Sequence, residues 1–222
     1  MSISHDTYES QEKLAAREEN VAVYRKLTGL HAIPAHKQYV TLCARQTDSP
    51  NSEINQMLRL GLIHSKKQFV GIDMVEELIV FNRATHPDAH WVLQCDGWQE
   101  ALLSFDFNPA LIYLDTEHIA DRKAQNLVAQ TMALCPVETV ILLNVAQSNP
   151  WYPTQEQGEF LAGLAKRVPN LKNWEPEQGV VTFDYVSYRT VMRTMAFYLK
   201  DNNYEDRQME TANCDSRNPA GV

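Results

Sequence analysis

Short apolar runs alternate with amphipathic segments along the middle of the chain. The runs are rich in β-branched and aromatic residues and read QYVTLCA, KKQFVGIDM, HWVLQCD, ALIYLD and VETVILLNVA. Strands that are almost continuously apolar are typical of a parallel sheet covered on both faces, and right-handed crossovers wind the intervening helices over both sides. The pattern therefore predicts an α/β fold with a doubly wound, mainly parallel sheet and helices on both faces.

The segments between these runs repeat apolar residues at helical spacing. Residues 8–28 predict an amphipathic helix that ends at Gly29. Ser49-Pro50 predicts a helix start, because serine can cap free amide groups and proline suits the first helical position. Further helices are expected over residues 75–85, over residues 124–134, and from the T-x-x-Q capping box at Thr154 and Gln157 to Val168.

The last third of the chain changes character. Two β-rich runs, GVVTFDYVSYR and TVMRTMAFYLK, are separated only by a short gap around Arg189 and Thr190. A parallel pair needs a crossover connection, so the short gap predicts an antiparallel hairpin. The polar residues after this hairpin are typical of a flexible tail. We expect a helical extension over residues 1–33, an α/β domain over 34–200 and a tail over 201–222.

Composition supports one globular domain. The chain has 222 residues, of which 44% are apolar and 22% charged, and this is enough to bury a substantial core. No apolar run approaches the roughly 18 residues that suggest a membrane span, and the first residues lack the cationic start and apolar stretch of a secretory signal. These features predict a cytoplasmic protein without a membrane partner.

Charge and cysteines narrow the choice of ligand only slightly. The net charge of −8 offers no broad basic face, so nucleic acid could bind only in a local basic groove. The four cysteines are scattered without a C-x-x-C pair, which argues against a zinc site and against a disulfide framework. We assign no residue to a metal.

Acidic residues follow three of the predicted strands. Asp73, Asp96 and Asp115 come at the ends of the second, third and fourth runs. The carboxyl ends of parallel strands meet at one edge of the sheet, and the ligand crevice of an open α/β fold lies beyond that edge. Carboxylates there suit ligands with hydroxyl, amine or cationic groups, because charge-assisted hydrogen bonds are the stronger kind.

Five βα units followed by an antiparallel hairpin resemble the class I methyltransferases that use S-adenosylmethionine (SAM), a three-layer αβα fold, over roughly residues 38–200. FVGIDM is similar to the segment that holds the SAM ribose, with Asp73 in that role. LQCDGW is similar to the segment that reads the adenine amino group, with Asp96 in that role and Trp98 beside the ring. The resemblance implies SAM as the cofactor, held by Ala44, Asp48, Ser49, Asp73, Met74, Asp96, Gly97 and Trp98.

The motif YLDTEH is similar to the family segment that carries catalytic or substrate-facing groups. The resemblance implies Asp115 and His118 as catalytic residues, with Glu117 beside them. Methyl transfer needs a nucleophile aligned with the methyl group and sometimes the removal of a proton, so no catalytic triad is expected. The resemblance further implies a methyltransferase acting on a small molecule or a nucleic-acid base. The D/N-P-P-Y/F/W motif of amino-methylating enzymes on nucleic acid is absent from this position.

The segment after the first run departs from the family. Family members carry a glycine-rich loop there, so that the backbone approaches the methionine part of SAM, but LCARQTDSPNSE contains no glycine. The same lack weakens a dinucleotide-binding interpretation, because the pyrophosphate needs a G-x-G-x-x-G turn. Arg45 and Gln46 stand at the usual ligand position. Either the loop binds SAM by another path, through Asp48 or Ser49, or the protein is a methyltransferase-like binding or assembly subunit without catalysis.

The aspartates also have a structural interpretation. Asp73-x-x-Glu76 and Asp96-x-x-Gln99 both resemble capping boxes, so these aspartates could simply start the helices that follow. A capping aspartate can leave one oxygen for a ligand, and the two roles are therefore compatible.

Aromatic residues and His118 have alternatives of the same kind. Trp98 could pack in the core, and His118 could be a solvated loop residue or a helix-start donor instead of a general base. Trp151 and Tyr152, which follow the fifth run, either line a substrate pocket or cover the helix beneath them.

Overall fold

The computed structural model describes residues 10–95, 97–146, 157–168, 170–171, 174–175, 181–187 and 190–199. Its helices are α1 (Gln11–Thr28), α2 (Glu53–Arg59), α3 (Glu76–Thr85), α4 (Trp98–Leu103), α5 (Arg122–Leu134) and α6 (Gln157–Ala165), with a 3₁₀ turn η2 at Lys66–Gln68. Its strands are β1 (Gln38–Leu42), β2 (Phe69–Asp73), β3 (His90–Leu93), β4 (Pro109–Ile119), β5 (Thr139–Ala146), β6 (Trp174–Glu175), β7 (Val181–Ser187) and β8 (Thr190–Leu199).

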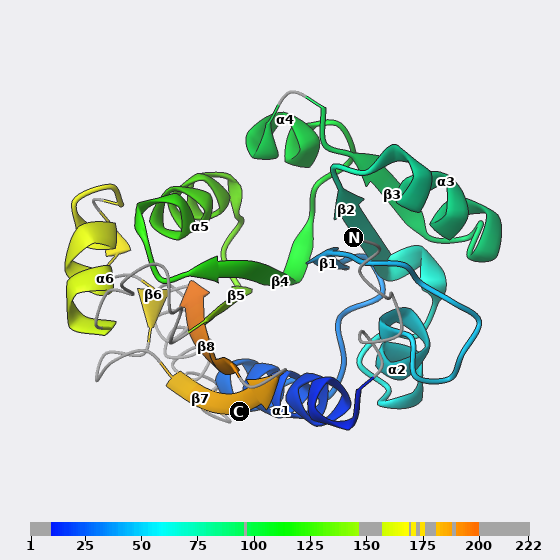
Figure 1. Ribbon diagram of the computed structural model, residues 1–222, viewed down its shortest axis with the longest axis horizontal. Coiled ribbons are helices and arrows are strands. Elements are labelled where there is room, and N and C mark those ends of the chain that lie inside the picture. The colour runs from blue at the N-terminus through cyan, green and yellow to red at the C-terminus, as the bar shows by residue number, and fades with distance from the viewer. Residues whose placement is uncertain are drawn as a thin grey trace, which may run out of the picture.

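The described strands form one eight-stranded sheet (Figure 1). Its order is β3-β2-β1-β4-β5-β8-β6, and β7 also pairs with β8. Strands β1 to β5 are parallel to one another, whereas β8 runs antiparallel to β5 and to β7. The order reverses at β1, as in other doubly wound sheets. The predicted mainly parallel sheet with an antiparallel hairpin near its end is confirmed.

Helices cover both faces of the sheet. One hydrophobic cluster joins α1, α2 and α3 to it and includes Tyr24 and Met57. A second cluster joins α4, α5 and α6 to the other face and includes Leu102 and Phe160. In Figure 1, α1 and α2 lie on one side of the sheet and α4, α5 and α6 on the opposite side. Burial of these apolar side chains is the main term that holds the three layers together.

α1 ends before Gly29 as predicted, but its first residue is Gln11 and not residue 8. Ser10 is the N-cap, and its hydroxyl accepts the backbone N–H of Lys13 at 3.3 Å. Gly29 lies in the left-handed region at φ 70°, and its N–H donates to the Arg25 carbonyl at 2.9 Å. Glycine adopts this conformation without the steric cost of a Cβ atom.

The helix after β1 begins later than predicted. α2 starts at Glu53 with Ser52 as N-cap, so the start predicted at Ser49-Pro50 is wrong. Ser49 instead opens a turn: its carbonyl accepts the N–H of Ser52 at 3.1 Å, and its hydroxyl accepts the N–H of Asn51 at 3.1 Å. Serine side chains favour such turns as much as helix caps.

Two strand ends also differ from the prediction. β3 ends at Leu93, three residues before Asp96, because its neighbour β2 ends at Asp73 and leaves the chain no further partner on that side. β4 continues to Ile119, because β5 runs beside it, with an irregularity in the pairing after Asp115. Asp115 therefore lies within the strand and not at its end.

Gly71 lets the Trp91 ring pack directly on β2. A Cβ atom at this position would collide with that ring and come within 2.8 Å of the Cys43 sulfur. We expect Gly71→Ala to lower the free energy of unfolding by about 1–3 kcal/mol, the usual cost of overpacking a core. Urea denaturation measures the loss. Gly158→Ala is the matched control, because nothing lies within 4 Å of its added Cβ; equal stability of the two variants would contradict the prediction.

Candidate functional site at the carboxyl edge of the sheet

Asp73 ends β2 at the edge where the parallel strands finish, which we call the carboxyl edge. Its Oδ1 accepts the N–H of Val75 at 2.8 Å. Val75, and not Asp73, is the N-cap of α3, so the capping box predicted at Asp73 and Glu76 is not formed. Burial raises the pKa of Asp73, and the backbone N–H groups of Val75 and Met74 partly oppose this shift. The fold therefore holds a partly desolvated carboxylate that it does not need as a helix cap.

We expect Asp73→Asn to raise the melting temperature near neutral pH. A carboxyl group with a raised pKa holds its proton more tightly in the folded state, so its ionisation opposes folding once the pH exceeds that pKa. Asparagine keeps an acceptor for the Val75 N–H without the charge. The gain should vanish below the ordinary pKa of 3.8, where both states of the wild type are protonated. Thermal unfolding at several pH values measures it, and a constant difference across the pH range would be the contrary result.

Two exposed apolar side chains follow Asp73. Met74 is 74% exposed and Val75 45% exposed, although both come directly after a buried strand. Apolar surface beside a hydrogen-bonding carboxylate is the combination that a nucleoside needs, because its base is flat and its ribose carries hydroxyl donors. This end of β2 can therefore hold both parts of such a ligand.

Asp115 faces the same layer as Asp73, two strands away. Thr41 of β1 is level with Gly71 of β2 and with Tyr113 of β4. Asp73 and Asp115 each lie two residues further on, so the register puts them at one height and on one face. Two strand spacings separate them by roughly 10 Å.

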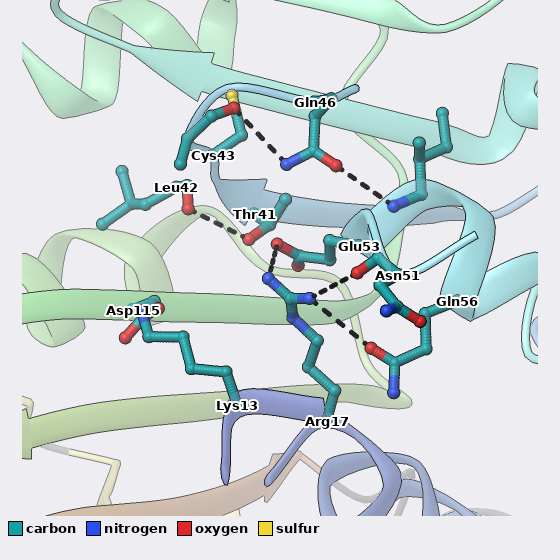
Figure 2. Close-up of polar contacts among 12 residues, drawn as sticks. Lys13, Arg17, Thr41, Leu42, Cys43, Gln46, Asn51, Glu53, Gln56 and Asp115 are labelled. Carbon is teal, nitrogen blue, oxygen red and sulfur yellow. Dashed lines mark hydrogen bonds and ion pairs between the residues drawn. The ribbon is translucent and has the colours of Figure 1, made fainter. Parts of the chain in front are cut away.

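Asp115 is bound by α1 and by β5. Lys13 of α1 reaches it from below in Figure 2, where Nζ donates to Oδ2 at 3.1 Å. From β5, Asn144 Nδ2 donates to Oδ1 at 2.6 Å. Only 17% of the Lys13 side chain and 9% of the Asp115 side chain are exposed. Asn144 is buried, and its Oδ1 accepts the Thr194 hydroxyl at 3.4 Å. These donors fix the orientation of the carboxylate.

Gln46 stands in the segment where the resemblance implies a glycine-rich loop. Its side chain is buried: Oε1 accepts the N–H of Ile54 at 3.2 Å, and Nε2 donates to the Ala44 carbonyl at 3.4 Å. Asn82 of α3 holds the same backbone, donating to the Ala44 carbonyl at 3.0 Å and accepting the Gln46 N–H at 2.7 Å. Protein side chains therefore satisfy the backbone groups of this segment.

Arg17 of α1 enters the same region from the opposite side (Figure 2). Its guanidinium is 3.8 Å from the Glu53 carboxylate and donates to the Asn51 carbonyl at 3.2 Å and to Gln56 Oε1 at 3.5 Å. The side chains of Arg17 and Glu53 are 4% and 3% exposed. Tyr39 donates its hydroxyl to Glu53 at 2.5 Å. Burial, with the Glu53 carboxylate, raises the pKa of Tyr39 well above its usual value, so the phenol stays a donor.

The other predicted cofactor residues in this loop have different surroundings. Ala44 is buried, and Asp48 is exposed. The carbonyls of Asp48 and Ser49 both accept from the Asn55 side chain, at 3.3 and 2.8 Å. Ser49 and Asp48 thus belong to the turn that precedes α2.

Trp98 packs in the core beneath α4. Its ring is buried, and its Nε1–H donates to the Thr131 hydroxyl of α5 at 2.8 Å. Gly97 precedes it as the N-cap of α4, with φ 149°. The indole of Trp98 is thus fully used in packing, in agreement with the core interpretation.

Several candidates lie outside the described residues. They are Asp96, the side chains of Glu117 and His118, and Trp151, Tyr152 and Thr154.

Sequence reasoning missed four residues at the carboxyl edge. They are Lys13, Arg17, Glu53 and Asn144. Three of them carry a signal that could have been used: Lys13 and Arg17 are four residues apart on one helix, and Asn144 interrupts the apolar run VILLNVA. A polar amide in a strand buried along its whole length indicates a specific partner.

The described residues contain neither a membrane-spanning helix nor a metal-binding cluster. Within the described ranges, no helix is both long and apolar enough to cross a bilayer. In the same part of the chain, no group of three or more histidine, cysteine, aspartate or glutamate side chains is arranged to hold a metal ion.

Comparison with known structures identifies the architecture. The CurJ carbon methyltransferase matches with a TM-score of 0.57 and 10% identity, over 89% of this chain and 58% of its own. Streptomyces venezuelae DesVI matches with a TM-score of 0.52 and 10% identity, over 87% of this chain and 99% of its own. The chain has the class I SAM-dependent methyltransferase fold. Methanocaldococcus jannaschii Trm5, solved with adenosine, has the same fold, with a TM-score of 0.51 and 10% identity, over 87% of this chain and 50% of its own. No family model matches the sequence, and no curated protein is significantly similar to it.

Within the methyltransferase fold, the two aspartates lie on either side of β1. Asp73 has Met74 and Val75 beside it and can receive a nucleoside. Asp115 has the cationic Lys13 beside it and can receive a positively charged or N–H group. The carboxyl edge therefore has one carboxylate, Asp73, suited to hydroxyl donors and a second, Asp115, suited to a cation.

Proposed function

We propose that the protein binds SAM at the carboxyl edge and transfers its methyl group to a small molecule or a nucleic-acid base. The observation that carries this proposal is the partly desolvated carboxylate of Asp73 with exposed Met74 and Val75 beside it. The ribose hydroxyls donate to Asp73, and the adenine ring covers the apolar side chains. Adenosine bound to Trm5, a protein of the same fold, supports a nucleoside as the ligand class.

The chemical groups of SAM match the residues present. Its ammonium and sulfonium are cationic, and Asp115, roughly 10 Å from Asp73, is the carboxylate toward which they would point. When bound, SAM supplies an activated methyl group. Asp115, oriented by Asn144, holds this cationic end, and His118 is the candidate that accepts the proton leaving the acceptor nucleophile.

A second candidate function is a methyltransferase-like binding or assembly subunit without catalysis. The buried Gln46 side chain favours it, because Gln46 bonds the backbone groups that a glycine-rich loop leaves to the ligand. The Arg17–Glu53 pair fills the space next to the same segment.

Calorimetric titration separates the two functions. We expect SAM and its demethylated product, S-adenosylhomocysteine (SAH), to bind with one site each and to raise the melting temperature at saturation, because a ligand of the native state stabilises it. Adenosine should bind more weakly, since it lacks the amino-acid part. Well-folded protein with no heat and no thermal shift for SAM and SAH would favour the non-catalytic subunit.

A further inference from the structure

Lys13 stands in a position that helix stability does not explain. It is the third residue of α1, in the turn that Ser10 caps. Cations near a helix N-terminus interact unfavourably with the helix dipole, and acidic residues are preferred there. The compensating partner of Lys13 is Asp115, 102 residues away in the chain. The position of Lys13 is thus explained by its ion pair with Asp115 and not by the stability of α1.

The backbone next to Lys13 is fixed to α2. Gln56 Nε2 donates to the carbonyl of Leu14 at 2.9 Å, and Arg17 one turn later is bound to Glu53 and Asn51. The ammonium of Lys13 is therefore tethered within reach of Asp115. A tethered group acts at a high effective concentration against any ligand that needs the same partner.

Lys13 occupies the oxygen of Asp115 that Asn144 leaves open. Asn144 donates to Oδ1, and Lys13 donates to Oδ2. An ammonium or sulfonium of a ligand needs this same carboxylate. Such a ligand and the Lys13 ammonium therefore compete for Oδ2.

We propose that Lys13 is an internal competitor that occupies Asp115 until the cationic part of the ligand displaces it. The inference rests on the proposed function, because it takes the amino-acid end of SAM or SAH as the displacing group. Ligands without a cationic end leave the Lys13–Asp115 ion pair in place. Ligands with a cationic end must displace Lys13 from Asp115, and this displacement weakens their binding.

The test compares wild type with Lys13→Met, which keeps an unbranched side chain of nearly the same length and removes its charge. Calorimetry with SAM and SAH should show binding about fivefold tighter to Lys13→Met, which is the upper end of what exposed ion pairs contribute. Adenosine should bind both proteins equally, because it has no cationic end. Lys13→Arg should behave as wild type. Lys26→Met removes an exposed charge from the other end of α1 and should also leave all affinities unchanged.

The outcomes separate this inference from the proposed function. Tighter binding of SAM and SAH to Lys13→Met, but not to the control variants, supports both the competitor role of Lys13 and the proposed function. Binding to Lys13→Met without measurable binding to wild type supports the competitor and shows the resting protein to be blocked. Equal or weaker binding to Lys13→Met overturns the competitor and leaves the SAM site standing. If SAM and SAH bind neither wild type nor Lys13→Met, the competitor role and the proposed function are both overturned. Tighter binding of adenosine, or the same gain in Lys26→Met, would reduce the effect to general electrostatics and also overturn the inference.

Discussion

Arg17→Met should lower the free energy of unfolding by about 3–5 kcal/mol, the cost of leaving one partner of a buried ion pair without the other. The Arg17 and Glu53 side chains are 4% and 3% exposed, so water cannot solvate the Glu53 carboxylate once the guanidinium is gone. Tyr39 still donates one hydrogen bond to that carboxylate, but a neutral donor does not balance its charge. Urea denaturation at neutral pH measures the loss.

A double-mutant cycle isolates the charge. Glu53→Gln keeps an acceptor for Tyr39, and in combination with Arg17→Met it removes both charges together. We expect the double variant to be more stable than Arg17→Met alone, because replacement of both buried charges costs less than removal of one. Additive losses in the double variant would show that Arg17 acts through its packing, and the buried-pair explanation would then fail.

Asp73→Asn should weaken SAH binding by about one to two orders of magnitude. The loss corresponds to about 1.5–3 kcal/mol, the contribution of hydrogen bonds to a charged acceptor. The same variant is expected to be more stable than wild type at neutral pH, so it would gain stability and lose affinity for SAH. Such a trade between stability and binding is typical of a functional residue and opposite to that of a structural one. Isothermal titration calorimetry measures the affinity.

Asp88→Asn is the matched control for Asp73. Asp88 is an exposed aspartate in the turn after α3, at the opposite end of β3 from the carboxyl edge. Its substitution removes the same charge and should leave the dissociation constant of SAH unchanged. Equal affinities of wild type and Asp73→Asn would mean that the ribose does not lie at β2.

The order of strands and helices could be predicted because burial on both faces leaves a strong mark on the sequence. The run VETVILLNVA is predominantly apolar, and all eight residues of β5 are buried. Gly29 and the gap near Thr190 were equally informative, since each has one dominant backbone consequence.

The ends of helices and strands were less predictable where two side chains could play the same structural role. Ser49 and Ser52 both suit a helix cap, and local pattern cannot rank them. The structure starts α2 after Ser52, while Gln46 takes up the amide of Ile54. The end of β3 depends on the length of β2 beside it, which is a tertiary property.

The polar part of the site could be predicted only in part. Asp73 ends β2, and the resemblance of FVGIDM to the family segment singled it out as a candidate. Lys13 and Asp115 are 102 residues apart, and Asn144, on a third element, donates to the same carboxylate. Such contacts arise from the packing of α1 on the sheet, and no local pattern along the chain encodes them.

A crystal structure of the protein with SAH is the most direct test of the central claim. It should show the ribose hydroxyls bonded to the Asp73 carboxylate, the adenine against Met74, and the amino-acid end at Asp115 with Lys13 displaced. SAH bound elsewhere on the molecule, or an Asp73 carboxylate without ligand in crystals grown at saturating SAH, would contradict the claim.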